Sequence, residues 1–125
     1  MKLSEIIKPE FTTALAALKN NRLPGKASYR VASLIKLVRA ELSSFEEFRK
    51  DLLERLADKD ADGRPIIENG AYKLSDESLK QFGEEMKGAN DADVELGAPI
   101  KISDLGEGFS IEPQHLDALG SAVSE

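Results

Sequence analysis

The stretch that decides the fold is Ala27–Leu56, ASYRVASLIKLVRAELSSFEEFRKDLLERL, which contains no glycine and no proline. Apolar residues recur in it every seven positions, and a second apolar row accompanies them. The first row is Val31, Val38, Phe45 and Leu52, and the second is Leu34, Ile35, Leu42, Phe48, Leu53 and Leu56. The pattern predicts one helix with a wide apolar stripe, about 45 Å long at 1.5 Å per residue.

A shorter helix is expected before it, over Ser4–Asn20, with Pro9 in its first turn, where the missing N–H of proline costs nothing. Leu23-Pro24-Gly25 then turns the chain back and gives a helical hairpin over about residues 4–57. The first helix can cover only part of the stripe, so the C-terminal half, another copy or both must cover the far end. The predicted partner or oligomer interface is Phe45, Phe48, Leu52 and Leu56.

Turn and capping residues organise the rest of the chain. Asn69-Gly70 lies between two apolar runs and predicts a hairpin. Ser75 predicts the N-cap of a helix that ends near Lys87. Three further short elements are expected, namely strands at 94–96 and 100–102 and a helix from Pro113 to Leu119.

These elements predict an α+β fold that is mainly helical, with a long N-terminal helical hairpin followed by a small antiparallel sheet and two short helices. A length of 125 residues is close to the commonest size of a single domain. We therefore expect one domain, with the helical hairpin over about 4–57 and the small sheet with its short helices over about 64–120.

The composition excludes several classes of chemistry and of location. The chain has no cysteine, which excludes disulfides, zinc–thiolate sites and cysteine nucleophiles. No signal peptide is visible, and no apolar run approaches the ~18 residues that span a bilayer. We expect a cytoplasmic protein with no membrane partner.

Charge is divided unevenly along the chain, whose net charge is −6. Residues 1–39 hold eight basic and two acidic residues, and residues 40–125 hold nine basic and 21 acidic residues. The free N–H groups at the start of the long helix could hold a small anion, such as a nucleotide signal, with the help of nearby cations. The candidate anion-binding residues are Lys19, Arg22, Lys26 and Arg30. The overall negative charge disfavours binding to duplex nucleic acid.

Asp58, Asp60, Asp62 and Gly63 match the first half of an EF-hand calcium loop. The second half departs from the motif, because Asn69 stands where the bidentate glutamate belongs. The three aspartates are a weak calcium candidate, and a solvated acidic turn is the competing interpretation.

No catalytic constellation emerges from the remaining residues. Gly25-Lys26-Ala27-Ser28 lacks the first glycine of a phosphate-binding loop, since Asn20 occupies that position. His115 is the single histidine and has no cysteine or triad partner at a suitable spacing. We therefore expect a protein that is not an enzyme and has no cofactor.

The chain resembles a group of small bacteriophage and prophage proteins of unassigned function. The resemblance rests on Leu23–Ala32, on Glu41-Leu42 with Phe45-Glu46-Glu47, on Ile100–Leu105 and on Pro113–Leu119. It implies a phage-borne product that acts in virion assembly or on the host cell. The leading hypothesis is a non-enzymatic interaction protein that self-associates or docks on a partner protein through its long helix. The alternative is a binder that sequesters a small anionic ligand through its basic N-terminal third.

Overall fold

The computed structural model describes residues 1–106 and 108–124. The chain divides into two compact units, Met1–Leu42 with Ala92–Glu125, and Ser43–Asp91. We call them the terminal unit and the middle unit. Helix α3 (Gly25–Leu56) belongs to both, because the division falls inside this helix. The fold is the expected α+β type, mainly helical.

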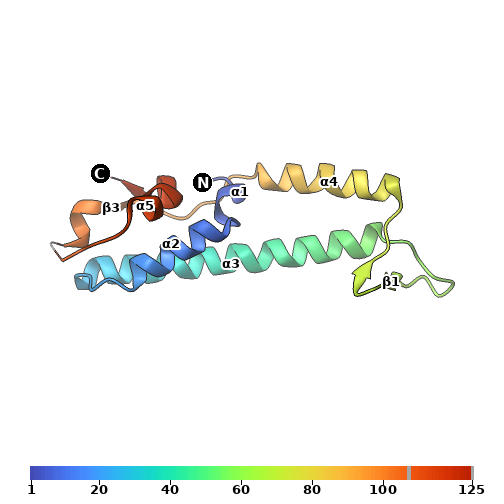
Figure 1. The fold of residues 1–125 in the computed structure, drawn as a ribbon, viewed down its shortest axis with the longest axis horizontal. Coiled ribbons are helices and arrows are strands. Elements are labelled where there is room, and N and C mark those ends of the chain that lie inside the picture. Colours follow the sequence, from blue (N-terminus) through green and yellow to red (C-terminus); the bar gives the residue numbers. More distant parts are fainter. Residues whose placement is uncertain (107, 125) are drawn as a thin grey trace. The chain divides into compact units, whose positions relative to one another are not determined.

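The terminal unit begins with two helices where one was predicted. Helix α1 (Leu3–Ile6) ends before Lys8, and helix α2 (Pro9–Lys19) begins with Pro9 at its first position. Lys8 is extended, with φ −69° and ψ 135°, because the residue before a proline avoids the helical region. Helix α2 then lies alongside the first part of α3 (Figure 1).

The core of the terminal unit is formed by apolar faces of α1, α2 and α3 and by the C-terminal segments. Helix α5 (Pro113–Leu119) packs against α2. The side chains that are almost fully enclosed are Ile6, Phe11, Leu18, Val31, Val38, Leu105 and Leu119. The predicted stripe of α3 is thus buried in its first half.

Strand pairing in the terminal unit differs from the expected antiparallel sheet. Strand β3 (Ile100–Lys101) pairs in parallel with β4 (Val123–Ser124), while the 3-10 helices η1 (Ile102–Leu105) and η2 (Gly120–Ala122) flank the pair. The predicted strand at 94–96 is irregular backbone. The alternation of apolar and polar residues in this segment is nevertheless reflected in their burial, since Val94 and Leu96 are buried and the residue between them is exposed.

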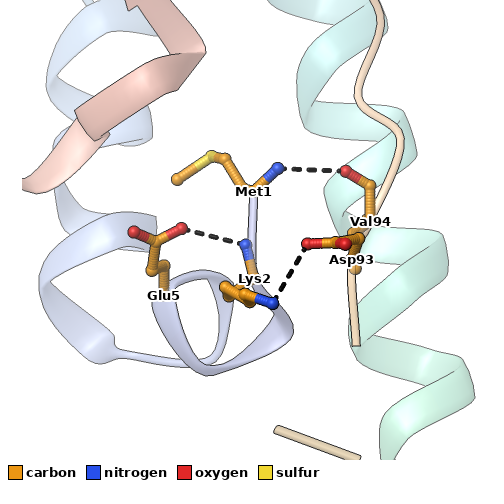
Figure 2. A network of polar contacts seen from close by, with 5 residues as sticks. All are labelled: Met1, Lys2, Glu5, Asp93 and Val94. Atoms are coloured by element: carbon orange, nitrogen blue, oxygen red, sulfur yellow. Dashed lines mark hydrogen bonds and ion pairs between the residues drawn. The ribbon is translucent and has the colours of Figure 1, made fainter. Parts of the chain in front are cut away.

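The segment 92–94 pairs with the first residues of the chain (Figure 2). The Val94 N–H donates to the Met1 carbonyl at 2.7 Å, and the Met1 amino group donates to the Val94 carbonyl at 3.2 Å. The Lys2 ammonium lies 3.4 Å from a carboxylate oxygen of Asp93. These contacts tie Met1–Leu3 to the segment that follows the middle unit, and no sequence pattern predicted them.

The middle unit contains the predicted hairpin. Strand β1 (Ile67–Glu68) pairs antiparallel with β2 (Ala71–Tyr72). Asn69 and Gly70 have φ values of +53° and +79°, as a type I′ turn requires at its two central positions. The sequence therefore located this turn correctly.

Three main-chain hydrogen bonds close a ring at the base of the hairpin. The Asp58 N–H donates to the Lys73 carbonyl, the Lys73 N–H to the Ile66 carbonyl, and the Ile66 N–H to the Asp58 carbonyl, at 2.8, 2.9 and 2.8 Å. Each of the three residues donates once and accepts once. The ring joins the end of α3 to both arms of the hairpin.

Helix α4 (Asp76–Asn90) follows the hairpin. The Ser75 hydroxyl oxygen accepts a hydrogen bond from the Ser78 N–H at 3.1 Å, which confirms the predicted N-cap. The helix continues beyond Lys87 to Asn90, and Gly88 lies inside it. A glycine weakens a helix interior by only about 1 kcal/mol, so it does not have to end one.

Candidate functional site

The middle unit has very little core. Of the 18 buried apolar residues in the part of the chain that the structure describes, 16 belong to the terminal unit. The middle unit contributes only Leu52 and Ala57, which are 2% and 5% exposed. Helix α4 is amphipathic, yet none of its residues, all of which the structure describes, is buried.

Large apolar side chains of the middle unit are exposed to solvent. Phe48 is 37% exposed, Leu79 is 52% exposed and Ile67 is 61% exposed. Phe45 and Leu56 are half-buried. We define the apolar surface of the middle unit as Phe45, Phe48, Leu56, Ile67 and Leu79.

Leu52 does not belong to this surface, and the prediction that it forms an interface is corrected. Its side chain is only 2% exposed, so it offers almost no accessible surface to a partner. The residues on either side of it along the helix, Phe48 and Leu56, stay partly accessible. The sequence pattern gave all four residues of the stripe equal weight because periodicity does not show which of them the folded chain buries.

A second surface lies in the terminal unit, where α2 and α3 meet. A groove of about 300 Å³ is floored by buried Leu15 and Val38 and by half-buried Ile35 and Leu42. Its edge carries the exposed cations Lys19 and Arg39. A neighbouring depression adds Lys36 beside the same two cations and Ile35. We call this surface the basic groove.

None of the depressions described in the terminal unit is lined by all four predicted anion-binding residues. Lys19 lines the basic groove. Arg30 lines a different cavity, of about 310 Å³, where its guanidinium donates to the Ala98 carbonyl at 2.7 Å. Arg22 and Lys26 line neither cavity. Lys19 and Arg30 thus line different depressions of the terminal unit.

Sequence reasoning missed Lys36 and Arg39 as partners of Lys19. The signal was present, since Ala32, Ile35, Lys36 and Arg39 follow the i, i+3, i+4, i+7 spacing of one helix face. The predicted site instead grouped cations by their closeness to the start of the helix. Grouping the cations by helix face would have placed Lys36 and Arg39 together.

The acidic turn is organised by its own backbone. One carboxylate oxygen of Asp60 accepts hydrogen bonds from the N–H groups of Asp62 and Arg64, at 2.9 and 3.0 Å. No group of three acidic or histidine side chains among residues 1–106 and 108–124 is arranged to hold a metal ion. The calcium candidate formed by Asp58, Asp60 and Asp62 is thus not supported, and the segment is an aspartate-stabilised turn.

The Tyr72 hydroxyl donates to a carboxylate oxygen of Glu54 at 3.0 Å and so links β2 to α3 within the middle unit. This hydrogen bond, followed by desolvation and by the negative charge of Glu54, raises the pKa of Tyr72 above its usual value of 10.0. A raised pKa in the folded state stabilises the fold at pH values below the unfolded pKa, and this contribution is lost as the pH rises through the folded pKa.

We expect Tyr72→Phe to lower the stability of the chain at neutral pH and to have less effect as Tyr72 ionises in strongly alkaline solution. The physical reason is that the phenolate cannot donate to Glu54. The measurement is urea denaturation of both proteins over a series of pH values, with Tyr29→Phe as the control, because Tyr29 is 73% exposed. A stability difference that stays constant up to the alkaline limit would contradict the expectation.

His115 lies in the first turn of α5 and is half-buried. It lines a depression of about 260 Å³ that is also lined by Pro9, Glu10, Thr13, Gln114 and Ala118. Among the helices of residues 1–106 and 108–124, none combines the length with the apolar composition that a membrane span requires.

Comparison with known proteins adds no assignment. No family model, no curated protein and no solved structure matches the chain. A function must therefore be inferred from the two surfaces described above.

Proposed function

We propose that this chain is a non-enzymatic interaction protein that self-associates through the apolar surface of its middle unit. One observation carries the proposal. The second half of α3 and the whole of α4 both have an apolar face, yet the unit that contains them buries very few side chains. Over residues 43–91 only two side chains are buried. A unit of this size needs a larger core than that, or a partner, to be stable.

The exposed residues are of the kind that partners cover. Covering an exposed large apolar side chain is favourable because it removes apolar area from water. Phe48, Ile67 and Leu79 all belong to the 49-residue middle unit, whereas the terminal unit exposes only Tyr29 and Leu37 among its large apolar residues that the structure describes. The resemblance to small phage proteins favours virion assembly or the host cell as the setting.

The test is to replace Phe48 and Leu79 together by serine and to compare association with that of the unchanged chain. We expect the unchanged chain to associate reversibly at tens of micromolar. The double variant should associate at least about thirtyfold more weakly, because each replacement removes roughly 1 kcal/mol or more of burial. Sedimentation velocity over a concentration series measures this. Tyr29→Ser combined with Leu37→Ser is the matched control, since both residues are exposed in the terminal unit.

Two results would count against the proposal. A strictly monomeric unchanged chain would remove self-association. Equal weakening by the control variant would mean that any exposed apolar residue contributes, and that the middle unit has no special part. Circular dichroism of each variant checks that the helices persist.

A further inference from the structure

The basic groove and the middle unit carry opposite charge. The middle unit holds 13 acidic and eight basic residues, for a net charge of −5. The groove carries Lys19, Lys36 and Arg39, and no acidic residue lines either of its two depressions. Complementary charge is what sets partner choice and association rate at protein interfaces.

The three cations of the groove have no acidic neighbour along their own helices. Positions three and four residues away from each of them are occupied by apolar residues, by serine or by another cation. Lys36 and Arg39 are themselves three residues apart, a spacing at which like charges repel. No ion pair involves any of the three in the described residues. An acidic partner would relieve this repulsion.

The floor of the groove supplies the apolar part of an interface. Ile35 and Leu42 are half-buried, and Ala16 at the edge is exposed. Cations around an apolar floor fit a partner that presents both carboxylates and apolar side chains. The middle unit presents both, with exposed Glu84 and Glu85 on α4 in addition to the exposed apolar residues defined above.

We propose that the basic groove of one copy receives the middle unit of a second copy. The inference rests on the proposed self-association and specifies its geometry as heterologous, because two different surfaces of the chain meet. Heterologous contacts close into rings or continue as filaments, unless two copies exchange them reciprocally. In this contact the groove covers apolar side chains that the middle unit leaves exposed. The carboxylates of the middle unit lie beside the cations of the groove.

The first test reverses the charge of the groove. Lys19→Glu with Arg39→Glu should weaken association by about a hundredfold, because like charges then face each other across the interface. Both side chains are exposed, so the fold should persist. Arg22→Glu with Lys26→Glu is the matched control, since it makes the same change of charge at exposed residues of the same unit outside the groove. The unchanged chain should also associate more weakly at high salt.

The second test identifies the residues that meet. Isotopically labelled and unlabelled copies are mixed and treated with a carbodiimide, which joins a lysine amine to a carboxylate in direct contact. Mass spectrometry should find links between the two copies from Lys19 or Lys36 to carboxylates within residues 43–91. Links between copies that are spread evenly over the other lysines would overturn the inference.

The outcomes separate this inference from the proposed function. If the groove variant associates as strongly as the unchanged chain, the groove is not the docking surface, while self-association through the middle unit stands. If the unchanged chain is a monomer, both proposals fail. If the control reversal weakens association as much as the groove reversal, only general charge matters, and the groove is again excluded.

Discussion

Replacing Phe11 with alanine should lower the free energy of unfolding by about 3–5 kcal/mol. Phe11 is 1% exposed and is among the largest side chains enclosed in the terminal unit. It belongs to α2, which packs against α5. Deleting the ring therefore removes the apolar contacts that it makes in the core. It also leaves a cavity, because the surrounding helices cannot move together enough to fill the space.

Urea denaturation followed by circular dichroism measures this loss. Phe48→Ala is the matched control, because it deletes the same ring at a position that is 37% exposed. Its expected cost, measured at a concentration where the chain is monomeric, is about 1 kcal/mol or less. Similar losses for both variants would contradict the contrast between a well-packed terminal unit and a poorly packed middle unit.

The second large effect should appear within a single helix. We expect the amide hydrogens of α3 to exchange with solvent on the order of a hundredfold faster after Leu42 than before it, because opening is easiest where few apolar contacts must be broken. The first part of the helix buries Ala27, Val31, Leu34 and Val38, whereas the part beyond Leu42 buries only Leu52. Hydrogen exchange with residue resolution tests this at low protein concentration.

The comparison has an internal control, since both segments belong to the same helix and differ mainly in what covers them. The protection of the second segment should rise with protein concentration if a second copy covers the middle unit. Uniform protection along α3 that does not change with concentration would contradict both the difference in core and the proposed association.

Local signals in the sequence predicted the elements of the fold well. Asn69-Gly70 indicated the hairpin, Ser75 the N-cap of α4, and Pro113 the start of α5. In each case one residue has a conformational preference that acts within a few positions along the chain. The break before Pro9 could have been predicted in the same way, because the restriction on the residue before a proline is equally local.

Contacts between distant segments were not predictable in this way. The pairing of Met1–Leu3 with residues 92–94 and the parallel pairing of Ile100–Lys101 with Val123–Ser124 join short segments that have little pattern of their own. For the candidate surfaces, periodicity identified the apolar stripe of α3. It could not show that Leu52 is buried while Phe48 stays accessible, because both residues fit the same apolar stripe.

The ring formed by Asp58, Ile66 and Lys73 consists of backbone groups alone. Any residue except proline can therefore form these hydrogen bonds at the three positions. Proline is the exception because it has no backbone N–H to donate. This end of the middle unit is free to vary in charge and size over evolutionary time without losing its shape. A change of charge at these three positions should therefore leave the hydrogen bonds at the base of the hairpin in place.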